Sequence, residues 1–538
     1  MFGNNPTMRN LSNIPATLLW SLLLSCFVFA ALSVISFKNT DILSDSLYAY
    51  DEADYMYAAE KGFLANHADR GTLPFDVFYA HGMKTGFEKS KWGQLSKFIR
   101  SSDDIAFYRH FHGPLYFYWL QAAKSLGLSS EKQMRFATLV LLLFSLLLFC
   151  VLLYMLFPNQ PFIMFPPFIM LFVLGPSMIL TFNHITPHGL YVVLSLASLG
   201  GCALYCKYGL RRYWYVSVMA ASLAFLTIEY SAILILTMLI TLWLFRKTHF
   251  TALSGPQRLR FVTGSILCFT LPIVILWPGG LFKLTIVKNY LFYAYFTLIR
   301  GDLYSSFSAL QVWGMRVIES PFEYLVLLYG LAALPFLIKK NRWLIPLGLY
   351  VLFILLTSMR NQSTFPQYLA SIFPVFYLIA ATGLLVTLKN RPMFLKTATL
   401  LFITAGILAN SCTFFMFHTS RSWQNMPHEI TSLDDLKTIL AKNDAPLFVP
   451  RDYIPVIHYY FPTTKLNPFN PVFENHRTVV GKAFSLLGNQ SGHILLIFDH
   501  DAAELPEMIE PRCLIESRQE LFLSNHTPNA ICYRLSCR

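Results

Sequence analysis

The chain has 538 residues, of which 55% are hydrophobic and 13% are charged, and its mean hydropathy is +0.48. Soluble domains carry about 25% charged residues, so this composition excludes an ordinary soluble protein and predicts an integral membrane protein. The net charge of +13 arises from Lys and Arg in short loops, as on the cytoplasmic side of membrane proteins. The sequence has no basic patch with interleaved aromatic residues outside those loops, so a nucleic-acid partner is not expected.

Apolar segments of spanning length recur along the first three quarters of the chain. A helix needs about 20 apolar residues to cross a bilayer, and the first such segment is Pro15 to Phe37. It exceeds the apolar core of a signal peptide, so we expect a retained first helix. Residues 38–113 are too long and too polar to cross lipid and form a large first outer loop. Ten further segments predict helices near 134–156, 161–181, 189–206, 213–228, 230–245, 262–282, 322–338, 343–359, 366–388 and 397–416.

The count of about eleven helices depends on Tyr213 to Phe245, which is too long for one span at about 1.5 Å per residue. Glu229 lies in its middle, so we expect two helices with a turn at this residue. All the basic loops then face one side: Lys207, Arg211 and Arg212; Arg246, Lys247, Arg258 and Arg260; Lys339, Lys340 and Arg342; Lys389, Arg391 and Lys396. That side is the cytoplasm, which places the N-terminus inside and residues 38–113 outside.

The composition changes after Phe417, where Pro, Asn, Asp and His become frequent. We expect residues 1–416 to form the membrane domain and residues 417–538 a small extracytoplasmic α/β domain. A helix is predicted over 433–441, strands over 446–449, 493–498 and 531–535, and a Pro-rich loop over 467–471. Cys513, Cys532 and Cys537 lie in this tail, and two of them are expected to pair if it faces an oxidising compartment.

The large first loop begins and ends with groups suited to chemistry. It opens with Asp51, Glu52 and Asp54 within a short acidic stretch just after the first helix. A carboxylate there would accept a proton from a hydroxyl or coordinate a hard cation. The loop closes at residues 109–119 (RHFHGPLYFYW), where Arg and His donors suited to phosphate precede an interfacial aromatic segment. Each stretch alone is also compatible with an ordinary solvated loop.

Taken together, the two stretches resemble the C-type (GT-C) glycosyltransferase superfamily. The similarity is to the branch with the lipid A aminoarabinose transferase and the protein O-mannosyltransferases. It rests on residues 51–58 (DEADYMYA), on residues 112–119 (HGPLYFYW) and on residues 365–369 (FPQYL) before a late helix. The chain departs from the family pattern at His112, where a Lys is usual, at Glu229, where a basic residue is usual, and at Asn183 to His188, where an acid is often found.

The resemblance implies a glycosyltransferase that uses a sugar carried on polyprenyl phosphate, at the outer face of the membrane. Asp51 matches the family's catalytic acid and would act as base or orient the acceptor hydroxyl, with Glu52 supporting it or holding a cation. The acceptor would be a lipid, a glycan or a protein, and a divalent cation as cofactor stays open. The residues expected to contact substrate are Asp54, Arg109, His110, His112, Tyr116, His184, His188 and Arg360.

Two other classes of function compete with this interpretation. A transporter or flippase of an amphiphilic substrate is the main alternative, but such proteins usually show related halves and charges at mid-membrane. A surface-glycan polymerase or ligase would favour a large outer loop late in the chain, whereas the large loop here comes first. A bacterial inner membrane is the expected location, with the endoplasmic reticulum membrane as the alternative.

Overall fold

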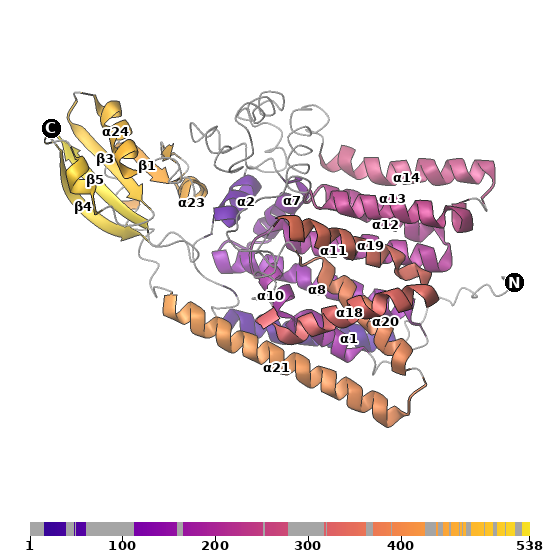
Figure 1. The fold of residues 1–538 in the computed structure, drawn as a ribbon. Helices are drawn as coiled ribbons and strands as arrows, with labels where there is room; N and C mark the ends of the chain where they lie inside the picture. Colours follow the sequence, from indigo (N-terminus) through magenta and orange to yellow (C-terminus); the bar gives the residue numbers. More distant parts are fainter. Residues whose placement is uncertain are drawn as a thin grey trace.

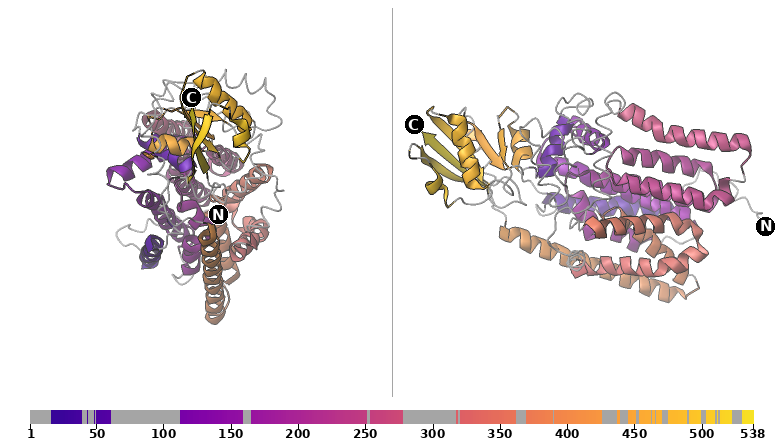
Figure 2. Two further views of the ribbon diagram at one scale, coloured as in Figure 1. Left: turned by 90° about the vertical axis from the view of Figure 1, so that its left-hand side faces the viewer. Right: turned by 45° about the horizontal axis from the view of Figure 1, so that its top comes forward.

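A computed structural model describes the parts of the chain that build the fold and the candidate site. These parts are residues 16–38, 43, 48, 50–60, 112–158, 165–250, 253–277, 317–318, 320–361, 369–388, 390–425, 437–438, 445–450, 453–461, 463–464, 466–469, 475–488, 490–498, 503–509, 511, 513–521 and 530–538. Long helices lie side by side in one bundle. A small domain of helices and a β-sheet lies beyond one end of that bundle (Figures 1 and 2).

Seven helices of the described chain are long and apolar enough to cross a membrane. They are α1 (Ala16–Lys38), α8 (Glu131–Leu156), α11 (Pro187–Tyr208), α13 (Ser231–Phe245) with the π-helix Arg246–Phe250, α14 (Gly255–Leu276), α18 (Pro321–Lys340) and the first part of α21 (Met393–Asn425). The 3₁₀ turn Arg342–Leu344 with α19 (Ile345–Asn361), and α20 (Ile372–Leu388), are shorter apolar helices. The chain is thus an integral membrane protein, while the total of eleven spans stays a prediction.

The helix predicted over 161–181 is interrupted, which is a correction to the sequence-based expectation. The structure has α9 (Pro166–Leu174) and α10 (Pro176–Phe182), with Gly175 in extended backbone between them. Pro176 lacks an N–H and its ring clashes with the carbonyl of the preceding turn, which favours the break at Gly175. The first turn of α10 is tied instead to α18, because Glu323 accepts hydrogen bonds from the Ser177 N–H (3.2 Å) and hydroxyl (2.9 Å).

The predicted turn at Glu229 is confirmed. Helix α12 (Arg211–Phe225) ends just before it, and α13 starts at Ser231. The turn is fastened to the bundle by the Tyr191 hydroxyl, which donates to the Tyr230 carbonyl at 3.1 Å. Helix α14 begins earlier than predicted, at Gly255, because Ser254 and Gln257 form a capping box and Pro256 suits the first turn.

The basic loops gather at one end of the bundle. Lys207 donates to the Leu156 carbonyl, His249 lies 3.4 Å from the Cys206 carbonyl oxygen, and the Tyr215 hydroxyl donates to the Arg260 carbonyl at 3.4 Å. The start of α21 and the end of α18 lie at this same end (Figure 1). Helix α2 (Tyr50–Glu60) and helix α7 (Leu115–Ser125) lie toward the opposite end of the bundle from the basic loops (Figure 1).

The C-terminal domain is α/β, as predicted, and adds elements that the sequence did not indicate. Its five-stranded sheet has the order β2-β1-β3-β5-β4. Strands β1, β2 and β3 run parallel to one another, and β5 runs antiparallel to both of its neighbours, β3 and β4. The strands are β1 (Leu447–Pro450), β2 (Leu466–Phe469), β3 (Gly492–Phe498), β4 (Cys513–Leu521) and β5 (Ala530–Cys537), and the helices are α23 (Ile454–Tyr460), α24 (His476–Leu487) and α25 (Leu505–Met508).

Two expectations for this region need correction. The Pro-rich segment 467–471 was predicted as a loop, but Leu466–Phe469 is a strand; its Pro468 is tolerated because β2 lies at the sheet edge. The domain boundary predicted at 416/417 falls inside α21, which runs on to Asn425. The disulfide joins Cys513 to Cys537, while Cys532 is a buried thiol. The predicted helix 433–441 lies largely outside the described residues.

Candidate functional site

Helix α2 carries the acidic motif and turns one face into the protein. Glu52, Ala53, Met56 and Ala59 are buried, at spacings that share one helical face. Helix α2 packs against α7 on one side and against α23 of the C-terminal domain on another. Asp51 lies in its first turn, but the Asp51 side chain is outside the described residues. Asp54 is half-buried on the same helix.

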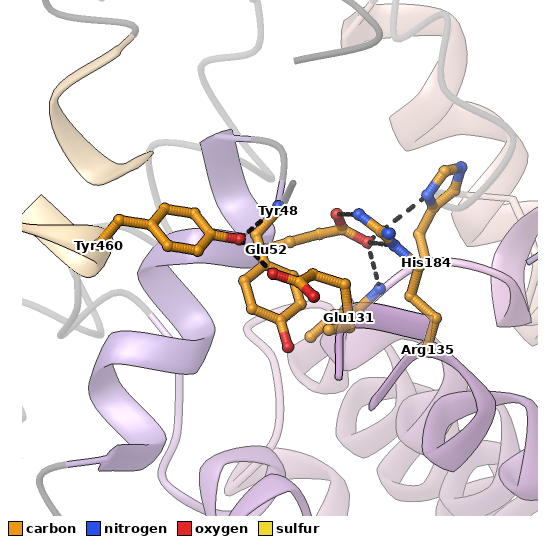
Figure 3. Close-up of polar contacts among 7 residues, drawn as sticks. Tyr48, Glu52, Glu131, Arg135, His184 and Tyr460 are labelled. Carbon is orange, nitrogen blue, oxygen red and sulfur yellow. Dashed lines mark hydrogen bonds and ion pairs between the residues drawn. The ribbon is translucent and has the colours of Figure 1, made fainter. Parts of the chain in front are cut away.

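Glu52 is held by a buried ion pair with Arg135 (Figure 3). Arg135 donates from Nε to Oε1 at 3.0 Å and from Nη2 to Oε2 at 2.6 Å, and the Ile185 N–H donates to Oε1 at 3.0 Å. The exposed fractions of the Glu52 and Arg135 residues are only 3% and 2%. Burial alone would raise the pKa of the Glu52 carboxyl, but Arg135 and then His184 hold it well below its usual range. Glu52 is therefore an ionised anchor for α2, since both its oxygens already accept hydrogen bonds.

Sequence reasoning missed Arg135, although a signal for it was present. Arg135 lies in the first turns of α8, directly before an apolar run that continues to Leu156. Ionisable residues in spanning segments are costly and usually pair inside the bundle. A search for the carboxylate partner of this Arg would have pointed to the acidic motif. Removing one member of such a buried pair costs roughly 3–5 kcal/mol, because the other charge is left without compensation.

His112 and Glu229, two departures from the family pattern, contact each other. His112 Nδ1 lies 2.9 Å from Glu229 Oε2, and the Glu229 side chain is only 2% exposed. The backbone brings them together, because the Leu115 N–H donates to the Leu226 carbonyl at 2.9 Å. A Cβ on Gly113 would approach the Leu226 backbone to 2.2 Å, so only glycine fits this close approach. The pair places an imidazole and a buried carboxylate side by side at this end of the bundle.

The connection between α10 and α11 contributes further polar groups. The His184 side chain is 34% exposed and its Nδ1 lies 3.6 Å from Glu52 Oε1. Asn183 Oδ1 and Thr186 Oγ1 are buried and have no hydrogen-bond partner within the described part of the chain. Buried polar atoms without partners are rare in native proteins and frequently bind water or a ligand. Residues 183–186 thus offer hydrogen-bonding capacity directly beside Glu52.

Two other predicted substrate residues lie in the interior of the bundle. The Tyr116 hydroxyl contacts Thr138 Oγ1 at 3.0 Å and the residue is fully buried; burial raises the pKa of Tyr116, so the hydroxyl stays protonated. His188 is buried in the first turn of α11, with its ring edge-on to Tyr230 at 6.4 Å between centroids. Both side chains therefore pack in the interior, Tyr116 against Thr138 and His188 against Tyr230. Arg109, His110 and the Arg360 side chain lie outside the described residues.

A divalent cation was left open by the sequence. Among the described residues, no group of three or more His, Cys, Asp and Glu side chains is arranged to hold a metal ion. The Arg135 guanidinium pairs with the Glu52 carboxylate in the described arrangement, and a divalent cation stays an open expectation. Among the described residues, the site therefore combines the anchored Glu52 carboxylate, the His112–Glu229 pair, the His184 imidazole and the buried Asn183 and Thr186 side-chain oxygens, at the end of the bundle opposite the basic loops.

Comparison with known proteins identifies the fold. No protein-family model and no curated protein matches the chain. Among solved structures, ArnT from Cupriavidus metallidurans superposes with a TM-score of 0.56 at 13% identity, over 97% of this chain and 98% of that one. The same enzyme bound to undecaprenyl phosphate gives 0.56 at 14% identity, over 97% and 98%. The Archaeoglobus fulgidus oligosaccharyltransferase, solved with Zn and sulfate, gives 0.51 at 13% identity, over 92% of this chain and 69% of that one. The chain therefore has the fold of C-type membrane glycosyltransferases over nearly its whole length.

Proposed function

We propose that this protein is a membrane glycosyltransferase that moves a sugar from a polyprenyl-phosphate donor to an acceptor at the outer face. The observation that carries the proposal is the anchoring of α2, which bears Asp51, by the buried Glu52–Arg135 pair beside His184 and residues 183–186. The shared fold with ArnT, including its complex with undecaprenyl phosphate, supports a lipid-phosphate donor. The proposed acceptor is a hydroxyl group of a lipid, a glycan or a protein.

In the proposed reaction, the acceptor hydroxyl oxygen attacks the anomeric carbon of the donor sugar. The bond from that carbon to the phosphate oxygen breaks, and polyprenyl phosphate leaves with the electron pair. Asp51 is assigned as the base that takes the hydroxyl proton, and Glu52 fixes the helix that carries it. His112 and His184 are assigned to donate hydrogen bonds to the leaving phosphate, and Arg109, which lies outside the described residues, is assigned as a cation for the charge that develops on it.

We further propose that this end of the protein lies outside the cytoplasm, in a bacterial inner membrane. The basic loops at the opposite end favour a cytoplasmic location for that end. The Cys513–Cys537 disulfide favours an oxidising compartment for the C-terminal domain. Thiol alkylation of intact cells followed by mass spectrometry tests this, because burial raises the pKa of Cys532 to about 12 and leaves it a poor competitor. Free, alkylated Cys513 and Cys537 in unreduced protein would contradict the assignment.

The test of function is sugar transfer by the purified protein in lipid, from a panel of radiolabelled polyprenyl-phosphate sugars. Wild type is compared with Asp51→Asn and with Glu60→Gln, an exposed acid at the far end of the same helix. Release of sugar by wild type and Glu60→Gln, but not by a folded Asp51→Asn, is expected. Release that survives Asp51→Asn would remove Asp51 from the base role. No release from any donor, even with membrane lipids and an acceptor extract added, would favour a transporter.

A further inference from the structure

The C-terminal domain contacts the anchored pair of the site through one short helix. Helix α23 has two buried faces: Tyr453 and Ile457 pack in the core under the sheet, whereas Val456 belongs to the core of the membrane domain. Tyr459 and Tyr460 pack partly buried against that second core. Helix α23 is therefore shared between the two domains, and it meets the membrane domain at α2.

Tyr460 is bonded to two partners on the membrane side (Figure 3). Its hydroxyl donates to Glu131 Oε1 at 2.8 Å and accepts from the Tyr48 N–H at 3.2 Å. The Tyr48 ring, which is 1% exposed, stacks near Tyr460 with centroids 6.2 Å apart. The Arg135 guanidinium lies over the same Tyr48 ring, 5.7 Å from its centroid. A continuous set of contacts thus leads from the C-terminal domain to the partner of Glu52.

The position of Glu131 gives this contact a specific consequence. Glu131 and Arg135 are four residues apart on α8, with the acid nearer the N-terminus. This is the spacing and order at which a Glu and an Arg pair most favourably on a helix. In the structure, however, Glu131 is held by Tyr460 while Arg135 makes both its described carboxylate bonds to Glu52. The Tyr460 hydroxyl keeps a competing carboxylate away from Arg135.

We propose that Tyr460 is a positioning residue, through which the docked C-terminal domain keeps Arg135 available to Glu52 and so fixes helix α2. When α23 leaves, or when the hydroxyl is removed, Glu131 is released to compete for Arg135 and α2 loses its anchor. The inference rests on the proposed function, because α2 carries the proposed base. It makes transfer depend on the docking of the C-terminal domain against α2.

Neighbouring Tyr459 provides a matched control. Its hydroxyl donates to Glu60 Oε1 at 3.1 Å, at an exposed position, and Glu60 also pairs with Lys124. Tyr459→Phe therefore removes the same chemical group from the same helix without freeing Glu131. Glu131→Gln is the second control, because a Gln side chain still accepts a hydrogen bond from Tyr460 but does not form an ion pair with Arg135.

The experiment uses the full chain in lipid nanodiscs, with two readouts. The first is sugar transfer from the donor identified in the panel, as kcat and KM. The second is hydrogen–deuterium exchange of the peptide that covers residues 50–60, which needs no activity. Tyr460→Phe is expected to lower kcat on the order of tenfold with little change in KM, and to speed exchange in α2. For Tyr459→Phe and Glu131→Gln, we expect kcat and the exchange rate of α2 to stay within about twofold of the wild-type values.

The double variant Tyr460→Phe/Glu131→Gln decides between positioning and simple docking. If Glu131 competes for Arg135, removing its charge restores kcat and slow exchange in α2. A double variant as slow as Tyr460→Phe would overturn the proposal, as would a Tyr460→Phe variant that matches wild type in both readouts. Restored exchange in a protein that transfers no sugar would support the positioning role and sink the glycosyltransferase assignment.

Discussion

The buried Glu52–Arg135 pair makes a quantitative prediction for the variant Arg135→Met. The substitution removes two hydrogen bonds, at 3.0 and 2.6 Å, from a carboxylate that is 3% exposed. Glu52 keeps its bond from the Ile185 N–H and its contact with His184 Nδ1 at 3.6 Å, but the buried carboxylate loses the guanidinium that pairs with both its oxygens. We expect the free energy of unfolding to fall by roughly 3–5 kcal/mol. Lys124→Met, which breaks the exposed pair with Glu60, is the matched control and should cost about 0–1 kcal/mol.

The sign of the pH dependence separates this explanation from a loss of packing. In wild type the folded-state pKa of Glu52 is lowered, so its contribution to stability is complete above the ordinary Glu pKa and is lost only as the pH falls below it. In Arg135→Met the main influence that lowers this pKa is lost, so burial, which raises it, dominates. A raised pKa in the folded state makes stability fall as the pH rises, so the deficit should be larger at pH 8 than at pH 5.5.

The assay is thermal unfolding in detergent at these two pH values, monitored by helical circular dichroism. The double variant Glu52→Gln/Arg135→Met should recover most of the loss, because neither charge then remains buried. The reasoning would be refuted if Arg135→Met lowered the free energy of unfolding by no more than Lys124→Met does. A deficit that grows on acidification would also refute it, since that would require a group other than Glu52 to lose its partner.

Three further predictions follow from described contacts. Glu323→Leu should lower the free energy of unfolding by about 1–3 kcal/mol for each buried donor that loses its acceptor, and Glu323→Gln should lower it less. Thermal unfolding of the two variants measures the difference. Gly113→Ala should abolish sugar transfer and lower the melting temperature, because its Cβ would meet backbone at 2.2 Å, whereas Gly481→Ala, with nothing within 4 Å, should be neutral or stabilising. Reducing Cys513–Cys537 should destabilise the C-terminal domain by about 3–4 kcal/mol, given its separation of 24 residues, and limited proteolysis should detect this.

The Glu323 cluster also explains how the bundle tolerates its interrupted helix. Glu323 is 1% exposed and accepts bonds from Ser177, from Ser320 at 3.0 Å and from Tyr377 at 2.5 Å. These donors come from α10, from the residue before α18, and from α20. Freed backbone groups at a helix break must be satisfied by neighbours when no water is present. The break then leads through α10 to residues 183–186, which border Glu52.

Much of the site could be anticipated because its motifs lie beside apolar segments that fix their depth. The acidic stretch follows the first span, residues 112–119 precede α8, and residues 183–188 join two helices, so all three were expected at one end of the bundle. The contacts among them could not be anticipated. Glu52 and Arg135 are 83 residues apart, and His112 and Glu229 are 117 apart. The sequence around each of these residues does not indicate which distant residue it contacts.

The C-terminal domain shows the same division. Its three cysteines allowed three pairings, and the sequence favoured none of them. The sheet register places Cys513 directly opposite Cys537 on β4 and β5, and turns Cys532 to the other face. The double role of α23 was equally hidden, because its apolar residues serve two cores that are built from distant segments.

By itself the sequence determined the membrane class, the apolar segments, the grouping of the basic loops at one end of the bundle, the turn at Glu229 and the motifs that resemble a glycosyltransferase. Hydropathy, charge and turn chemistry are properties of each segment alone, so they can be read along the chain. Tertiary structure decided that Arg135 neutralises Glu52, that His112 meets Glu229, and that Tyr460 links the C-terminal domain to Glu131 and Tyr48 beside Arg135. These are pairings between distant segments, and a buried charge selects its partner only when packing brings that partner within reach.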